Sequence, residues 1–154
     1  MNALFEAIRN QNIDQVRSVL QSDPELLKTT DQRGSTPLIL ATYVDLFDIT
    51  KALIEAGSDV NQQDASGNTA LMGVCFKGNV QIASLLIANG ADTNKINFNG
   101  ATALIYATTF AQPEVVKLLL ENGADKSIKD GKGNTAAQHA QMQGLSEICS
   151  LLEA

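Results

Sequence analysis

The sequence repeats itself with a period of 33 residues. Four segments, "DQRGSTPLILA", "DASGNTALMGV", "NFNGATALIYA" and "DGKGNTAAQHA", begin at Asp31, Asp64, Asn97 and Asp130. A glycine and a threonine hold the same positions in all four segments. A period of this length indicates one supersecondary unit that recurs along the chain. A single unit of this size cannot bury its apolar face alone, so the units are expected to stack into a solenoid.

Each unit reads as a turn followed by two helices. The shared glycine favours a tight turn with positive φ, and the shared threonine favours the N-cap of a helix. In one unit Pro37 follows the threonine, which suits the first turn of a helix that should run to about Tyr43. A second helix is expected from Phe47 to about Ala56, with its apolar residues on one face and a left-handed glycine after its end. The leucines at the same position of three successive second helices are expected in the core: Leu53, Leu86 and Leu119.

These motifs resemble a known repeat family. "GSTPLILA" followed by "LIEAGSDVN" is similar to an ankyrin repeat, and so is "VVKLLLENGADKS". The resemblance implies an all-α solenoid of about five stacked helix-turn-helix units with short β-turn or hairpin tips. It implies one domain over residues 1–154, with an atypical first repeat (1–30), internal repeats (31–63, 64–96, 97–129) and a C-terminal capping repeat (130–154). The first segment resembles the opening repeat of small stand-alone bacterial ankyrin proteins.

The chain departs from the ankyrin pattern at two positions of the repeat. Glycine is expected between the paired helices and is present as Gly78 and Gly144, but Asp45 and Ala111 take its place elsewhere. Because a non-glycine residue is disfavoured in the left-handed region, altered turns are expected there. Apolar packing is expected to substitute for the hydrogen bonds of the motif's histidine, which is replaced by Ile39, Met72, Ile105 and Gln138.

Composition limits the class of protein. With 44% hydrophobic and 18% charged residues, the chain should be globular. Its formal net charge of -6 argues against a nucleic-acid groove, which needs clustered lysine and arginine. The start "MNALFEAIRNQNIDQV" is not typical of a signal peptide, and no apolar run is long enough to span a bilayer, so a cytoplasmic location is expected. No disulfide is expected between Cys75 and Cys149 in a reducing compartment.

The stretch "DGKGNTAAQHA" imitates two chemical motifs. Gly131, Gly133 and Ala136 have the spacing of a dinucleotide-binding turn, and His139 is the single histidine of the chain. A dinucleotide turn follows a core strand, however, whereas Gly133 is the fourth copy of the repeat's turn glycine. The stretch also lacks the acidic ligands of a calcium loop. We therefore expect no cofactor and no metal, and expect His139 to be a polar, non-catalytic residue on the outer face of the last repeat.

The resemblance implies that a partner binds the concave side, which consists of the turn tips and the first helix of each pair. Four of the seven aromatic residues fall on this surface, and aromatic side chains are common anchors of interfaces. An alternative is that these rings cover gaps between repeats. The cationic residues on the same face suit a partner with acidic groups. The positions implied for partner contact are Arg33, Tyr43, Val44, Asn68, Phe76, Lys77, Phe98, Asn99, Thr109, Phe110, Lys132, Met142 and Gln143.

The function that these features favour is a non-catalytic protein-protein interaction module, either adaptor-like or inhibitor-like. The chain should be monomeric on its own and should bind another protein rather than nucleic acid or a membrane. The alternative is a regulatory or sensor protein that binds a small molecule, or an enzyme whose site carries no recognisable motif. A deep pocket with converging polar groups would favour this alternative.

Overall fold

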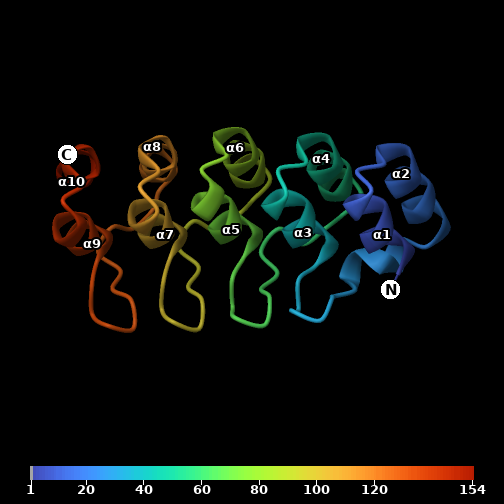
Figure 1. Ribbon diagram of the computed structural model, residues 1–154, viewed down its shortest axis with the longest axis horizontal. Helices are drawn as coiled ribbons and strands as arrows, with labels where there is room; N and C mark the ends of the chain where they lie inside the picture. Colours follow the sequence, from blue (N-terminus) through green and yellow to red (C-terminus); the bar gives the residue numbers. More distant parts are fainter. Residues whose placement is uncertain (1) are drawn as a thin grey trace.

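The computed structural model describes residues 2–154 and is helical throughout, with no strand among these residues (Figure 1). The first repeat also contains the 3-10 helix η1 (Pro24–Lys28). The helices are α1 (Ala3–Arg9), α2 (Ile13–Ser22), α3 (Pro37–Tyr43), α4 (Phe47–Glu55), α5 (Ala70–Lys77), α6 (Val80–Ala88), α7 (Ala103–Thr109), α8 (Pro113–Glu121), α9 (Ala136–Gln143) and α10 (Ser146–Glu153).

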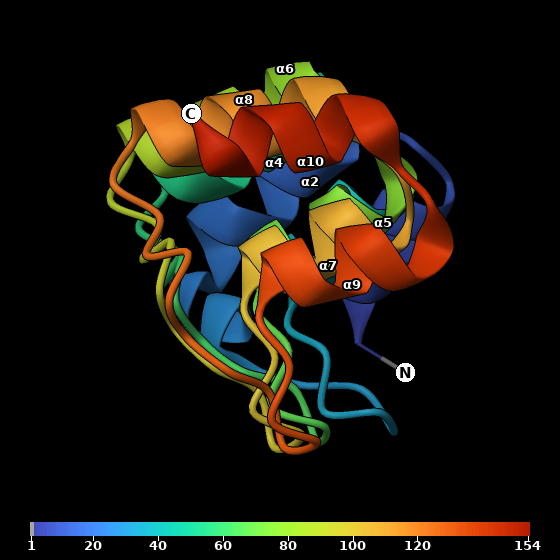
Figure 2. The same cartoon turned by 90° about the vertical axis from the view of Figure 1, so that its left-hand side faces the viewer.

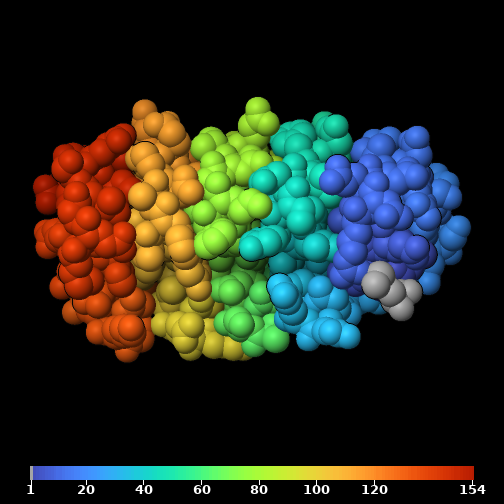
Figure 3. All heavy atoms as spheres, in the orientation of Figure 1, coloured from blue at the N-terminus to red at the C-terminus, as the bar shows by residue number. Residues whose placement is uncertain are grey.

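The helices form two layers of a solenoid. The odd-numbered helices pack against each other in one layer, and the even-numbered helices pack against each other in the other layer. The two helices of each pair also contact one another. Viewed along the long axis, the turn tips project together from the layer of odd-numbered helices (Figure 2). The space-filling view shows the repeats as successive bands along the molecule (Figure 3). The expected stack of helix-turn-helix units is therefore confirmed.

The core lies between the two layers and continues from repeat to repeat. Leu53, Leu86 and Leu119 are each 0% exposed, so the expectation for the repeated leucine is correct. Neighbouring apolar residues of both layers form one continuous buried cluster with them. Each repeat therefore depends on the next for the burial of its apolar face.

The repeated threonine caps the first helix of each pair, as the sequence predicts. Thr36, Thr69, Thr102 and Thr135 each accept a hydrogen bond from the backbone N–H three residues later. In the last repeat the Gln138 side chain also accepts from the backbone N–H of Thr135 at 2.8 Å, which completes a capping box. The expectation that apolar packing replaces the motif's histidine is therefore wrong at this position.

The turns between paired helices do not change where glycine is missing. Asp45 and Ala111 have φ of 62° and 54°, close to the 78° of Gly78 and the 70° of Gly144. The residue after Asp45, Ala111 or Gly144 donates its backbone N–H to the carbonyl five residues earlier, at 2.8–3.0 Å. The prediction of altered turns is wrong because helix packing on both sides determines the backbone path, and the non-glycine residues accept the left-handed conformation.

Two further observations concern the cysteines and the length of the helices. Cys75 and Cys149 are free thiols, and burial raises the pKa of the Cys75 thiol. Such a thiol is unreactive because the thiolate is the nucleophile. Within residues 2–154, the helices are all too short or too polar to cross a membrane.

Candidate functional site

The turn tips form a braced row along one edge of the solenoid. In each tip a side-chain oxygen of the first residue accepts two backbone N–H groups, as when Asp64 Oδ1 accepts from Ser66 and Asn68 at 2.9 Å. Asp31, Asn97 and Asp130 do the same. Successive tips are then joined by the backbone bonds Ala65 N–H to Arg33 O, Phe98 N–H to Ser66 O and Gly131 N–H to Asn99 O, at 2.8–3.1 Å.

A groove of about 1370 Å³ lies between the first two tips and the odd-numbered helices α1, α3, α5 and α7. It is open rather than enclosed, and both apolar rings and amide groups line it. The predicted site residues on its walls are Arg33, Tyr43, Asn68, Phe76 and Phe110. The groove therefore brings together part of the predicted surface from three consecutive repeats.

Aromatic rings from three repeats meet along the groove, and we call Tyr43, Phe76, Tyr106 and Phe110 the aromatic row. The centroids of Tyr43 and Phe76 are 6.4 Å apart, those of Phe76 and Phe110 4.4 Å, and those of Tyr106 and Phe110 6.0 Å. Tyr43, Phe76 and Phe110 nevertheless remain 45%, 43% and 38% exposed. The rings thus pack between repeats, as the alternative interpretation holds, and still leave apolar surface in solvent.

Tyr106 is a member of the row that sequence reasoning missed. Its ring stacks on Phe110, and its hydroxyl accepts from the Asn97 side chain at 2.8 Å. Tyr106 shares its repeat position with Leu40, Gly73 and His139, none of which is a tyrosine or a phenylalanine. Repeat phase alone therefore could not indicate its place beside Phe110.

Lys77 crosses the rim of the groove and is already engaged. Its Nζ lies 3.6 Å from Asp45 Oδ2 and 5.2 Å from the ring centroid of Tyr43. The Asp45 carboxylate also accepts from the Asn79 side chain at 3.1 Å. Lys77 therefore orders the rim between two repeats and is partly neutralised there.

The structure does not bring the whole predicted surface into the groove. The predicted residues outside its walls are Val44, Lys77, Phe98, Asn99, Thr109, Lys132, Met142 and Gln143. Phe47 and Val80 are exposed apolar residues that the prediction left out. Each is the first residue of the second helix of its repeat. Because both residues are apolar at the same repeat position, the sequence could have indicated them.

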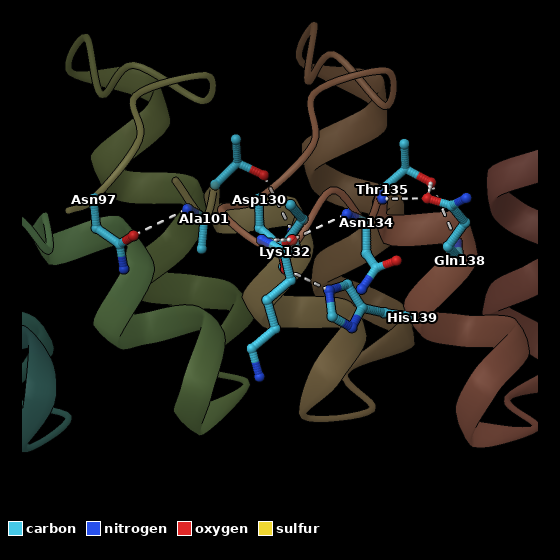
Figure 4. A network of polar contacts seen from close by, with 10 residues as sticks. Asn97, Ala101, Asp130, Lys132, Asn134, Thr135, Gln138 and His139 are labelled. Carbon is cyan, nitrogen blue, oxygen red and sulfur yellow. Dashed lines mark hydrogen bonds and ion pairs between the residues drawn. The ribbon is translucent and has the colours of Figure 1, made fainter. Parts of the chain in front are cut away.

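The single histidine lies inside a hydrogen-bond network of the last tip (Figure 4). His139 Nε2 is 2.7 Å from Asp130 Oδ2, and these side chains are only 17% and 12% exposed. The expectation of an outer-face histidine is therefore wrong, because the ring turns back to the tip of its own repeat. Partial burial would raise the pKa of Asp130. Hydrogen bonds from Asn134, His139 and Lys132, together with the charge of His139, outweigh this effect and hold the pKa below its usual range.

The preceding repeat contains a neutral equivalent of this pair. Asn97 takes the place of Asp130, Tyr106 takes the place of His139, and the two side chains are joined by a 2.8 Å hydrogen bond. The recurrence indicates that His139 braces a turn. Among residues 2–154, no three His, Cys, Asp or Glu side chains gather in a way that could hold a metal ion.

Comparison with known proteins defines the class. A family model of ankyrin repeats, in three copies, matches residues 1–64 and 43–130. The chain belongs to the ankyrin-repeat family, whose domains are typically non-catalytic modules for protein-protein interaction.

Relatives match parts of the chain. It is 44% identical over 59 residues to a putative E3 ubiquitin-protein ligase, XBAT34, of Arabidopsis thaliana, and 43% identical over 49 residues to the serine/threonine-protein kinase VIK of the same plant. It is 33% identical over 62 residues to the ankyrin repeat and SAM domain-containing protein 6 of Rattus norvegicus. These segments are 38%, 32% and 40% of this chain, but 15%, 11% and 7% of the relatives. The plant and rat relatives do not support the expected likeness to small bacterial proteins.

Proposed function

We propose that this chain is a non-catalytic binding module that docks a protein partner on its concave side, as an adaptor or an inhibitor would. The observation that carries the proposal is the aromatic row, in which Phe76 lies between Tyr43 and Phe110 and the three rings keep 38–45% of their surface exposed. Burial of apolar surface is worth about 25 cal/mol per Å², so covering these rings would stabilise a complex.

The groove geometry suits a protein surface. Its rings are pre-positioned by contacts between repeats, so a partner would lose little free energy in ordering them. Amide side chains such as Asn68 lie beside the rings and can orient a polypeptide backbone. We include in the proposal the predicted contact residues outside the groove, from Val44 at the end of α3 to Met142 and Gln143 in the last repeat.

The proposal also covers the oligomeric state of the protein, its location and the class of its partner. A monomer in the cytoplasm that does not bind nucleic acid agrees with the formal net charge of -6 and with the free thiols of Cys75 and Cys149. The five-repeat division at residues 31, 64, 97 and 130 is part of the same proposal, and each of these residues opens a turn tip.

A substitution in the aromatic row tests the proposal. Phe110→Ala should weaken binding of the native partner by roughly 2 kcal/mol or more, because truncated aromatic anchors usually cost this much. The partner is first identified by cross-linking from a photoreactive residue at position 76, and the affinity is then measured by calorimetry. The unfolding midpoint of the variant should fall only moderately, because the ring packs on Phe76 and Tyr106 but is 38% exposed.

Phe47→Ala is the matched control. Phe47 is 37% exposed, close to the 38% of Phe110, but lies outside the walls of the groove. The control should leave the affinity unchanged. Equal affinity of both variants for the partner, with a large loss of stability in Phe110→Ala alone, would show that the row serves packing between repeats and does not bind.

A further inference from the structure

The edge of the solenoid formed by the turn tips differs in charge from the rest of the chain. We define the tip edge as residues 29–36, 62–69, 95–102 and 128–135, the loops along the lower border of Figure 1. It carries three of the 17 acidic residues and four of the 11 lysines and arginines, namely Arg33, Lys95, Lys129 and Lys132. The remaining fourteen acidic and seven cationic residues leave the helical body strongly acidic, whereas the tip edge is slightly cationic.

The acidic side chains of the tip edge accept hydrogen bonds from the backbone, whereas its cationic side chains form no ion pair with the described residues. Asp31, Asp64 and Asp130 each accept two backbone N–H groups at 2.9–3.0 Å. Asp130 is further paired with His139. Across residues 2–154, the ion pairs within 4.0 Å involve none of the four cationic side chains of the tip edge. The three carboxylates keep their charge, so four cations against three anions leave the tip edge with a formal charge of +1 and with cationic side chains that have no ion-pair partner in the described part of the chain.

Two apolar side chains stand out between the cationic ends. Phe98 is 73% exposed and Ile96 is 49% exposed, while Asn97 between them is buried. Ile96 precedes Asn97 in the arm that enters the tip, and Phe98 follows it as the first residue of the turn. The Phe98 backbone N–H donates to Ser66 O at 3.1 Å, and its ring covers Gly67, where an added Cβ would lie 2.8 Å from the ring. Phe98 is thus a braced side chain whose outer surface is uncovered.

The spacing of these groups suits an extended chain. Neighbouring helices pack about 8–10 Å apart, so three repeat steps separate Arg33 from Lys132 by roughly 24–30 Å. An extended polypeptide advances about 3.3 Å per residue, and about eight or nine residues would cross this distance. The aromatic contact would fall between the two charged contacts, because Phe98 lies on the tip next to Lys132 and two tips away from Arg33.

We propose that the tip edge binds an extended acidic segment of the partner protein, with carboxylates on Arg33, Lys129 and Lys132 and an apolar side chain on Ile96 and Phe98. This inference rests on the proposed function and specifies the chemistry of the partner. A nucleic acid fits less well, because phosphate binding needs clustered cations and the body of the protein would repel a long polyanion. The exposed apolar pair also requires an apolar group that a carboxylate-bearing peptide can supply.

The test uses defined probes with the complete chain. A fluorescent peptide of about twelve residues, with glutamates on both sides of a central Leu-Phe pair, spans the distance estimated above. Its controls are the same peptide with lysine in place of glutamate and a single-stranded oligothymidine of equal length. In fluorescence anisotropy the acidic peptide should bind best. Its affinity should fall when salt rises from about 0.1 M to about 1 M, because the Debye length shrinks from about 10 Å to about 3 Å.

Variants locate the contact. Arg33→Glu and Lys132→Glu should each weaken peptide binding by about fivefold, in line with exposed ion pairs. Phe98→Ser should weaken binding by about tenfold, as expected for a central anchor. Lys51→Glu on α4 makes the same change in net charge on an exposed side chain outside the tip edge, and it should leave the affinity within about twofold.

Several outcomes would overturn the inference. These are a lack of binding by the acidic peptide up to millimolar concentration, equal or tighter binding of the lysine peptide or the oligothymidine, and an effect of Lys51→Glu as large as that of the tip variants. The native partner separates this inference from the proposed function. If Phe110→Ala weakens partner binding but the Arg33→Glu, Lys132→Glu double variant does not, the tip-edge inference is wrong and the concave site stands.

Discussion

The repeat that contains α7 and α8 and the last repeat, with α9 and α10, have the same backbone architecture but different means of stabilisation. α7 buries Ala103, Leu104, Ile105, Ala107 and Thr108, whereas α9 buries only Ala136 and Ala140. Where α7 has Leu104, Ile105 and Thr108, α9 has Ala137, Gln138 and Gln141. Both glutamines, Gln138 and Gln141, are exposed, whereas Ile105 and Thr108 at the equivalent positions of α7 are buried.

The last repeat forms some hydrogen bonds that are absent from the preceding repeat. It forms others between titratable side chains where the preceding repeat uses neutral ones. It has the Thr135–Gln138 capping box and the pair of His139 with Asp130. Lys126 Nζ donates to the carbonyls of Leu152 and Ala154 at 2.9 and 3.0 Å and so caps the end of α10. Because net hydrogen bonds contribute about 1 kcal/mol each, while a buried leucine contributes more, the last repeat should be the less stable of the two.

The largest effect is expected from the core leucine that both repeats share. Leu119→Ala should lower the free energy of unfolding by roughly 2–5 kcal/mol, because a fully buried side chain leaves a cavity between two neighbouring repeats. Leu152→Ala removes the equivalent side chain from α10, in the repeat whose first helix buries only two alanines, and its cost should lie at or below the lower end of this range. Urea denaturation of both variants measures the difference. Equal losses would contradict the proposed gradient of stability.

A smaller effect is expected at the turns between paired helices. Ala111→Gly should raise the free energy of unfolding by about 0.5–1 kcal/mol, because glycine adopts φ near 54° without the steric cost that alanine bears. Gly144→Ala should lower the free energy of unfolding by about the same amount. An added Cβ meets no atom within 4 Å there, so the left-handed backbone conformation is the only source of strain. Thermal unfolding of both variants is the measurement. Changes of the same sign would refute this account of the turns.

The smallest effect concerns the titratable pair of the last tip. The pKa of Asp130 is lowered in the folded state, so its contribution to stability is present above the unfolded pKa, near 3.9, and is lost as the pH falls through the folded pKa. Asp130→Asn should abolish this part of the acid dependence, because asparagine does not titrate. The turn should survive, because the asparagine oxygen can accept both backbone N–H groups, as that of Asn97 does. Unfolding free energies measured from neutral to acidic pH test it. Parallel pH curves for wild type and variant would show that the pair carries no such linkage.

The local features of each repeat were predictable because they depend on neighbouring residues in the sequence. The threonine cap is one example, because Thr36 accepts from the backbone N–H of Ile39, only three residues away. The buried leucines followed from the 33-residue period, because equivalent residues of stacked units occupy equivalent surroundings. These rules predicted a stack of helix-turn-helix units, and the resemblance to ankyrin repeats then implied the concave side as the binding surface.

Only the tertiary structure decided how side chains from different repeats meet. Phe110 lies one residue beyond the position equivalent to Phe76, yet its ring reaches Phe76, because helix stacking and side-chain rotamers set the contact. Ala111 keeps a left-handed turn against its own preference because packing on both sides outweighs a local cost of about 1–2 kcal/mol. His139 turns inward for a similar reason, since the tip of its repeat presents a carboxylate within reach. The sequence by itself determined the repeating architecture, whereas the tertiary structure decided which rings meet and which rings and charges remain exposed.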